Sequence, residues 1–273
     1  MRTAVVGHVE WVEFAQVERV PVPGEIIAAE ADWSVPAGGG AVAAVQLARL
    51  AGECTLYTAL GDDQHGHHSR AQLEELGVRV EAASRPGKPT RRAFTFVDEG
   101  GERTITVMGE RLHAEREDAL PWEELGEVDA VYFTAGGPEA LAAARAARVL
   151  VATARVMDVI EAAGVELDAI MRSGRDPSEA YRDYEPAPNL VVTTAAARGG
   201  RWEGREGRTG EWTAAKLPGP VADSYGCGDS FAAGFAFGLA RDGDVAAALE
   251  TAARCGAVCL TGHGPYERQL TLV

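Results

Sequence analysis

Short apolar runs bounded by Gly, Pro or acidic residues alternate with alanine-rich segments of helical length along most of the chain. This alternation is typical of β-α-β units around a mostly parallel sheet. Strands are predicted at Thr3–Val6, Thr55–Ala59, Ala130–Phe133, Val149–Ala152 and Leu190–Thr193. Helices are predicted at Ala41–Leu50, Ser69–Leu76, Pro138–Ala146, Gly228–Ala240 and Val245–Leu260. The pattern therefore predicts a doubly wound α/β sandwich.

Two stretches, about 9–35 and 91–109, break this alternation. Within the second, Arg92–Val97 and Arg103–Val107 alternate polar and apolar residues around a glycine-containing turn, which predicts a β-hairpin. We expect both stretches to form a small second sheet, a lid, over one end of the main fold. Since no repeat or linker sets them apart, the whole chain, residues 1–273, is predicted to be one domain. In open α/β sheets the ligand crevice lies at the carboxyl ends of the strands, where such a lid would cover it.

The charge balance is strongly acidic, with 26 Lys and Arg against 41 Asp and Glu and a formal net charge of −15. Such a molecule repels polyanions, so nucleic acid and anionic membranes are excluded as partners. No apolar run approaches the roughly 20 residues that span a bilayer, and the first residues do not resemble a signal peptide. We therefore expect a cytoplasmic protein.

The four cysteines form no CxxC pair and lie among apolar or small residues, which predicts reduced and mostly buried thiols. Cys255, Cys259 and His263 are spaced four apart and would share one face of a continuous helix, so a metal site is an alternative. Two glycines end the predicted helix around His263, however, and the histidines at 65–68 fit a solvated helix start. We expect neither group to hold a metal.

The sharpest chemical signal is the segment Asp223–Gly234, a glycine-flanked turn that enters a helix. Free N–H groups at a helix start carry partial positive charge, so Gly226, Cys227 and Gly228 can form an anion hole. Asp229, at the same point, can accept a proton from an attacking hydroxyl. The alternative is an ordinary helix N-terminus stabilised by an acidic residue.

A second glycine turn, formed by Gly38, Gly39 and Gly40, leads into the first predicted helix. By itself a triple glycine fits a flexible connection. Together with the later turn it predicts a site for two ligands, because one turn can admit a polar substrate close to the backbone while the other admits phosphate.

Together these turns resemble the two signatures of the ribokinase-like, or PfkB, family of carbohydrate kinases. Asp223–Gly234 is similar to the second signature, with its Asp-Thr-x-Gly-Ala-Gly-Asp core, and the glycine triplet is similar to the first. Between them, Gly61-Asp62-Asp63-x-x-Gly66 resembles another family motif. The resemblance spans nearly the whole chain and implies a ribokinase-like sheet with a β lid over a sugar or nucleoside.

The resemblance also implies Mg²⁺- and ATP-dependent transfer of the γ-phosphoryl group to a substrate hydroxyl, with Asp229 as the base and residues 226–228 as the anion hole. It implies substrate contacts from the glycine triplet and from an acidic residue, for which Glu10 and Glu13 compete. The positions that it assigns to the nucleotide are Thr194, Arg198, Gly199, Gly200, Gly262 and Gly264.

Several departures from the family pattern bear on activity. Val42 stands where the family usually has a sugar-binding asparagine, and Cys227 replaces an alanine. The family's Asn-x-x-Glu motif becomes Ser173-Gly174-Arg175-Asp176, so Asp176 is the carboxylate left to act on a nucleotide-borne Mg²⁺. Two functions stay open, a kinase with altered substrate preference and a non-catalytic nucleotide or metabolite sensor. A Rossmann dehydrogenase is disfavoured because no GxGxxG follows the first strand.

The expected partner is a small sugar, sugar phosphate, nucleoside or polyol. Net acidity argues mildly against a highly anionic substrate, but Arg91, Arg92 and Arg103 on the lid could reverse that expectation. The exposed edge or apolar face of the lid could pair with a second subunit and give a homodimer.

Overall fold

The computed structural model describes residues 1–272, and its centre is a nine-stranded sheet. Its strands are β1 (Thr3–Val6), β4 (Cys54–Gly61), β5 (Val78–Arg85), β8 (Ala130–Phe133), β9 (Val149–Thr153), β10 (Ala169–Ser173), β11 (Leu190–Thr194), β12 (Gly200–Gly204) and β13 (Thr209–Trp212). They lie in the order β13-β12-β11-β10-β9-β8-β1-β4-β5. Neighbours are parallel from β11 to β5, and the two remaining pairings are antiparallel. The predicted mostly parallel α/β fold is confirmed.

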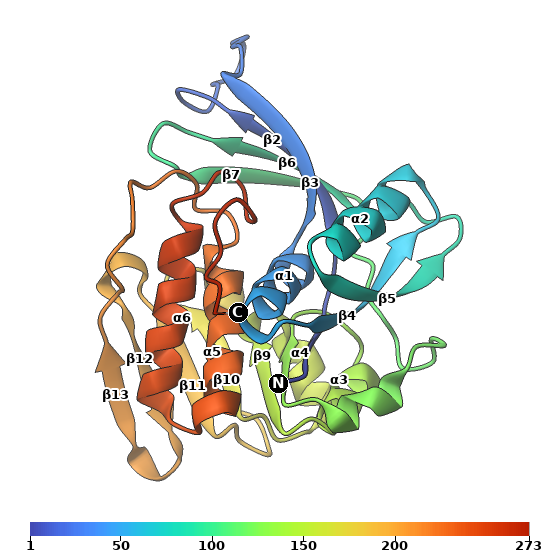
Figure 1. Ribbon diagram of the computed structural model, residues 1–273, viewed down its shortest axis with the longest axis vertical. Helices are drawn as coiled ribbons and strands as arrows, with labels where there is room; N and C mark the ends of the chain where they lie inside the picture. Colours follow the sequence, from blue (N-terminus) through green and yellow to red (C-terminus); the bar gives the residue numbers. More distant parts are fainter. Residues whose placement is uncertain (273) are drawn as a thin grey trace.

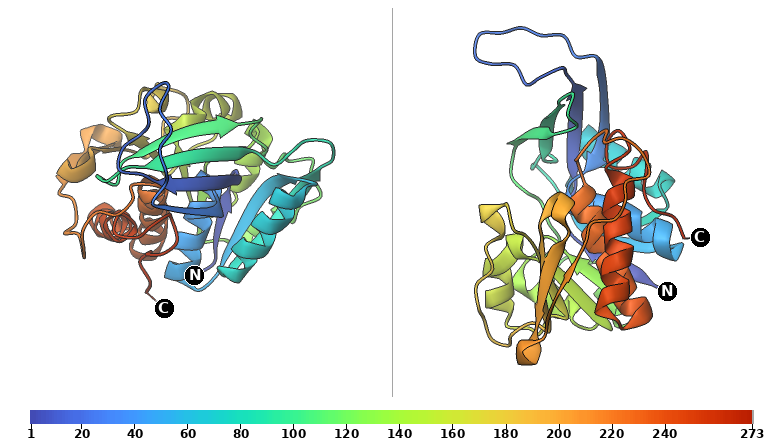
Figure 2. Two further views of the ribbon diagram at one scale, coloured as in Figure 1. Left: turned by 90° about the horizontal axis from the view of Figure 1, so that it is seen from above. Right: turned by 90° about the vertical axis from the view of Figure 1, so that its left-hand side faces the viewer.

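Helices cover both faces of this sheet (Figures 1 and 2). The α-helices are α1 (Gly39–Ala51), α2 (Gln64–Glu75), α3 (Pro138–Ala144), α4 (Met157–Ala163), α5 (Cys227–Asp242) and α6 (Val245–Cys259). Short 3₁₀ helices are η1 (Trp122–Glu127), η2 (Ala154–Val156), η3 (Pro177–Glu179), η4 (Ala196–Arg198) and η5 (Arg205–Gly207). Within residues 1–272, no helix combines the length and the apolar character that crossing a bilayer requires.

The central strands form because their side chains find apolar partners on both sides. In β1, Val5 joins the core under α1, α5 and α6, while Ala4 and Val6 join the core under α3 and α4. All three side chains are fully buried. Successive side chains of a strand point to opposite faces, so a strand covered on both faces reads as a continuous apolar run.

A separate four-stranded sheet forms the predicted lid (Figure 1). Its strands are β2 (Glu10–Gln16), β3 (Ala31–Ala37), β6 (Arg92–Val97) and β7 (Arg103–Met108), in the order β3-β2-β6-β7. The long connection between β2 and β3 extends away from the main body, as the right-hand view of Figure 2 shows. The two irregular stretches of the sequence therefore pair with each other, as expected.

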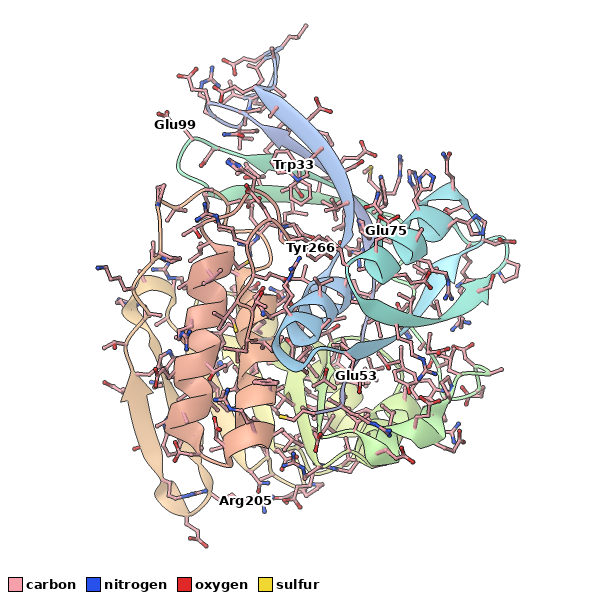
Figure 3. All side chains as sticks on the ribbon, viewed as in Figure 1. Trp33, Glu53, Glu75, Glu99, Arg205 and Tyr266 are labelled. Carbon is pink, nitrogen blue, oxygen red and sulfur yellow. The ribbon has the colours of Figure 1, made fainter. Side chains whose placement is uncertain are left out.

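The lid is fixed to the main body at two places. Near the C-terminus, the Tyr266 hydroxyl donates a hydrogen bond to the Pro36 carbonyl at 2.6 Å. Figure 3 shows Trp33 of β3 and Tyr266 at this junction. At the β6–β7 hairpin, the Ser224 N–H donates to the Gly101 carbonyl at 2.9 Å, and Arg103 Nη1 donates to the Ser224 carbonyl at 2.9 Å. The lid hairpin therefore contacts the segment that leads into α5.

The start of α1 is pressed against the carboxyl end of β1. A Cβ atom on Gly40 would lie 2.7 Å from the carbonyl oxygen and 2.8 Å from the nitrogen of His8. A Cβ atom on Gly7 would lie 2.7 Å from the Gly40 Cα atom. Two backbones can approach this closely only where neither carries a side chain, so these two glycines set the position of the first glycine turn.

We expect Gly40→Ala to destabilise the protein by about 1–3 kcal/mol, the usual cost of overpacking a site that cannot relax. For a chain of this size, each kcal/mol corresponds to about 2–4 °C in Tm. The matched control is Gly126→Ala, because a Cβ atom on Gly126 would meet nothing within 4 Å. Thermal unfolding of both variants measures the difference, and equal Tm values would contradict the proposed backbone contact.

Candidate active site

A cavity of about 1010 Å³ lies at the carboxyl ends of β10 and β11, beside α6. Three of the predicted nucleotide residues, Thr194, Arg198 and Gly200, line it. Its charged lining residues are Arg172, Arg175, Arg198, Arg201, Arg254, Glu211 and Glu250. Arginine therefore dominates this cavity although the whole chain has a net charge of −15, and a cleft lined by one sign of charge attracts ligands of the opposite sign.

The other three predicted nucleotide residues lie outside the lining of this cavity. Gly199 packs against the backbone of Trp212, whose side chain belongs to the lining. Gly264 donates its N–H to Asp223 Oδ2 at 2.9 Å, beneath the lid. Gly262 packs against Arg268. Gly262 and Gly264 therefore do not line this cavity, and their contact with a nucleotide stays a prediction.

The second glycine turn is held by a buried carboxylate. Asp223 is fully buried and accepts hydrogen bonds from the N–H groups of Tyr225, at 2.7 Å, and Gly264. Gly226 has φ of 77°, and a Cβ atom there would lie 2.9 Å from Val42 Cγ1. Glycine is therefore needed at this position, and Val42 packs against the turn, where it offers no polar atom to a sugar.

The turn presents the start of α5 to open space. Helix α5 begins at Cys227. The N–H of Ser230 donates a hydrogen bond to the carbonyl of Gly226, the residue that precedes the helix, at 2.9 Å. A Cβ atom on Gly228 would meet nothing within 4 Å. The N–H groups of a first helical turn have no partner within the helix, so this turn has donors and room for an anion. Burial raises the pKa of the Cys227 thiol.

Asp229 lies where the starts of two helices meet. A Cβ atom on Gly39, the first residue of α1, would be 2.9 Å from Asp229 Oδ1. Solvent still reaches the Asp229 side chain in part. Burial among the surrounding groups raises the pKa of this carboxyl to about 6, and the nearby Arg155 and Arg103 oppose the shift. A carboxylate with a pKa close to neutrality is well suited to accept a proton.

Next to Asp229, Glu10 and His8 line the base of the lid. The Glu10 side chain is only 8% exposed and lies 3.2 Å from Arg91 Nε and 3.6 Å from His8 Nε2. Burial raises the pKa of Glu10. A Cβ atom on Gly38 would lie 3.1 Å from the His8 ring. Glu10, His8 and the first glycine turn therefore surround one side of the Asp229 carboxylate.

The structure distinguishes between the two competing glutamates. Glu10 and Glu13 are three residues apart on β2, and side chains at odd spacing on a strand point to opposite faces. Glu13 is 42% exposed and pairs with Arg92 at 3.7 Å. The negative charge of Glu10, in contrast, contributes to the raised pKa of Asp229. The site therefore contains Glu10, and Glu13 lies on the outer face of the lid.

Two carboxylates follow β10, where the sequence identified one. Arg155 Nη2 lies 2.6 Å from Asp176 Oδ2 and 2.8 Å from Glu179 Oε1. Asp176 also caps the short helix η3 by accepting from the Ser178 N–H at 2.9 Å. Glu179 is 12% exposed, accepts from the Ser173 N–H, and contributes to the raised pKa of Asp229. Arg155 thus connects this carboxylate pair to the neighbourhood of Asp229.

A family model for pfkB family carbohydrate kinases matches residues 2–195 and, in an overlapping match, residues 138–271. The chain belongs to the pfkB family of carbohydrate kinases. This membership confirms the resemblance inferred from the two glycine turns and makes the chain a carbohydrate kinase.

Relatives and solved structures agree with this assignment to the pfkB family. An ATP-dependent ribose-1-phosphate kinase from Halopiger xanaduensis is 29% identical over 97% of this chain and 93% of its own length. A putative ribokinase from Agrobacterium tumefaciens has the same fold, with a TM-score of 0.82, 20% identity and coverage of 98% and 94% of the two chains. Arabidopsis thaliana ribokinase, complexed with ribose and ATP, gives a TM-score of 0.76, 18% identity and coverage of 98% and 95%.

Sequence reasoning did not single out His8, Arg155 or Glu179 of this pfkB-family kinase. None of them belongs to a glycine motif, and the three are widely separated along the chain. A usable signal was nevertheless present. His8 follows β1 and Arg155 follows β9 by two residues each, and residues just beyond the carboxyl ends of parallel strands meet at the ligand crevice.

We expect Asp229→Asn to be more stable than the parent at pH 8. A carboxyl whose pKa rises to about 6 on folding favours the folded state at low pH, and this contribution is lost as the pH rises through about 6. Asparagine does not ionise, so at pH 8 it removes the cost of holding a charged carboxylate in this partly buried position, roughly 1–3 kcal/mol of folding free energy. Tm measured from pH 4 to pH 8 should show a difference that grows up to about pH 6 and then levels off. A variant less stable than the parent at pH 8 would contradict the raised pKa.

Proposed function

We propose that this pfkB-family kinase transfers the γ-phosphoryl group of ATP to a hydroxyl of a sugar, nucleoside or related polyol, with Asp229 as the general base. The observation that carries the proposal is the position of Asp229. Its carboxylate has a pKa of about 6 and lies between the open first turn of α5 and the Glu10 side of the lid. An acceptor hydroxyl and a nucleotide phosphate can therefore meet at this carboxylate.

In the proposed reaction an acceptor hydroxyl lies within hydrogen-bond reach of an Asp229 oxygen. As the hydroxyl oxygen bonds to the γ-phosphorus, its proton passes to Asp229 and the bond from phosphorus to the leaving ADP oxygen breaks. Phosphoryl transfer asks a protein mainly for positioning and charge stabilisation. The N–H groups of Gly226, Cys227 and Gly228 are proposed to supply that stabilisation, because fixed donors cost no reorganisation during the reaction.

We propose that the arginine-lined cavity holds the nucleotide, with Thr194, Arg198 and Gly200 in contact with it and Gly199 supporting the turn. Its arginines suit the charge of a triphosphate, since guanidinium groups bind phosphate oxygens in pairs. Gly262 and Gly264 are proposed to act on the lid side of the second glycine turn. The named activities of the relatives, ribokinase and ATP-dependent ribose-1-phosphate kinase, support a pentose-type acceptor and ATP.

The carboxylates after β10 fit a Mg²⁺ ion that arrives with the nucleotide. Mg²⁺ usually keeps several waters and uses one or two carboxylates together with substrate phosphates. Asp176 and Glu179 supply such oxygens, and their pairing with Arg155 favours contact through water. Bound there, Mg²⁺ would neutralise charge on the β- and γ-phosphates. We propose, in addition, that the 273 residues act as one domain and that the lid can pair two subunits.

Asp229→Asn should lower kcat by roughly 10² or more with little change in KM, because the lost interaction belongs chiefly to the transition state. The variant should still bind MgATP, since asparagine keeps the shape and removes a negative charge near the phosphates. Steady-state turnover on any acceptor that the parent phosphorylates, together with nucleotide titration, provides the measurement. Near-normal turnover would rule out Asp229 as the base.

The matched control is Asp223→Asn, which changes the other aspartate of the same turn. Asp223 accepts two backbone hydrogen bonds and faces the body of the turn. Its substitution should lower Tm, because a buried N–H loses its acceptor at about 1–3 kcal/mol. It should cost less in kcat than Asp229→Asn. A larger loss of kcat from Asp223→Asn would reverse the two roles.

The pH profile should report the same base. Asp229 accepts a proton only when deprotonated, so kcat/KM should rise with pH and level off above about 6. Below that value it should fall about tenfold per pH unit. If two acceptors of different structure give the same fall of kcat/KM at low pH, the titrating group belongs to the enzyme and not to the acceptor. A profile that is flat from pH 5 to pH 8 would contradict Asp229 as the base.

A further inference from the structure

A second cavity, of about 630 Å³, opens at the carboxyl ends of β8 and β9 and at the base of the lid. Its charged lining is mostly cationic and consists of Arg91, Arg111, His113, Arg155, Arg182, Glu110 and Asp158. Arg91, which lines this cavity, lies 3.2 Å from Glu10, and Gly39 lies against both Asp229 and His8, so the cavity adjoins the proposed base. It lies toward β8, while the arginine-lined nucleotide cavity lies toward β11 to β13.

Pairing with acidic side chains differs among these arginines. Arg182 contacts Asp158 and Glu161, and Arg155 contacts the carboxylates that follow β10. Arg111, in contrast, forms no ion pair or side-chain hydrogen bond with any residue from 1 to 272. Arg91 Nε lies 3.2 Å from Glu10 Oε1, but the two atoms are not aligned as a hydrogen bond. The cavity therefore holds guanidinium groups whose donors are available.

Most of the charged groups around His8 are cationic, and the carboxylate among them is that of Glu10, 3.6 Å from His8 Nε2. Burial lowers the pKa of His8 well below its usual value, and Arg111, Arg91, Arg155 and His113 lower it further. Arg111 is exposed to solvent. Desolvation on the cavity side and then the nearby Arg91 lower the pKa of its guanidinium, and Glu10 opposes this shift. Cations placed close together repel one another, and Glu10 offsets only part of this repulsion. An anion placed among them would offset the rest.

The site lacks the asparagine that family members usually use to hydrogen-bond a neutral sugar. Val42 occupies that position and is packed against the second glycine turn. Two inward-facing side chains of the lid, Ile105 and Val107, are apolar and 41% and 49% exposed. They pair with Thr95 and Ala93, whose side chains are buried, so the inner face of the lid is apolar beside the cationic cavity. A ligand with one anionic group and a carbon skeleton matches both features.

We propose that the acceptor already carries a phosphate monoester, which Arg111 and Arg91 bind, with Arg155 between that phosphate and Asp229. This inference rests on the proposed kinase function. The reaction then joins the γ-phosphoryl group of ATP to a free hydroxyl of a sugar phosphate, the hydroxyl proton passes to Asp229, and ADP and a sugar bisphosphate are released. Arginine is suited to this task because its planar donors match phosphate oxygens bidentately.

The test compares sugars with and without phosphate as acceptors: ribose, ribose 1-phosphate, ribose 5-phosphate, fructose and fructose 6-phosphate, with gluconate as a carboxylate. ADP release and thermal shift are measured for the parent, Arg111→Gln, Arg111→Lys and Arg92→Gln. Arg92 is the matched control, because it lies on the outer face of the lid and pairs with Glu13. Arg111 has no partner among the described residues, so its loss should leave the fold intact.

We expect the parent to use a phosphorylated sugar at least tenfold better than its unphosphorylated form. Arg111→Gln should raise KM for that sugar about 10- to 100-fold, the usual effect of losing one charged hydrogen-bond donor, while KM for MgATP stays unchanged. Arg111→Lys should recover part of the loss because it keeps the charge, and Arg92→Gln should behave as the parent.

Equal use of phosphorylated and unphosphorylated sugars, or a KM unaffected by Arg111→Gln, would overturn the phosphate subsite and leave the kinase function standing. Gluconate used as well as the sugar phosphates would also overturn it, in favour of a general anion site. If none of these compounds, nor a nucleoside such as adenosine, nor a polyol such as glycerol, leads to ADP release, the kinase proposal fails, and thermal shift then decides on the subsite. Stabilisation by a sugar phosphate that is lost in Arg111→Gln would support it, and no stabilisation would overturn it.

Discussion

The close approach of two backbones at Gly7 and Gly40 fixes the geometry on which the rest of the site depends. It presses the start of α1 against the end of β1. Because α1 begins there, Gly39 lies against Asp229 of α5, and the chain that continues from β1 brings His8 and Glu10 to the same place. One steric constraint thus joins a strand end, two helix starts and the base of the lid.

The sequence was most informative where physical constraints act on neighbouring residues. β1 and β8 were predicted with their exact limits because they are buried on both faces and therefore continuously apolar. β5, β10, β12 and β13 were missed. β5, β12 and β13 lie at or next to the sheet edges, where polar, charged and glycine residues are tolerated and the apolar signal is weak. β10 lies inside the sheet, but its apolar run ends after three residues, at Arg172.

The same division applies to the candidate site. The glycine turns and Asp229 could be identified because a tight turn and a helix start need particular residues at fixed spacing. The association of Arg91, Arg111 and Arg155 could not, since these residues follow different strands and meet only after the sheet and lid assemble. Nor could spacing alone decide between Glu10 and Glu13, because the face of β2 that meets the body is set by its partner strands.

The contacts of Ser224 connect the lid hairpin to the segment that starts α5. Ser224 donates to the Gly101 carbonyl and accepts from Arg103, and it directly precedes the turn that starts α5. If the hairpin moved away from the main body, these bonds would break and the segment that orders the turn would lose its support. In the proposed mechanism the anion hole would then be least well held when water enters freely, which would protect bound nucleotide against hydrolysis between turnovers.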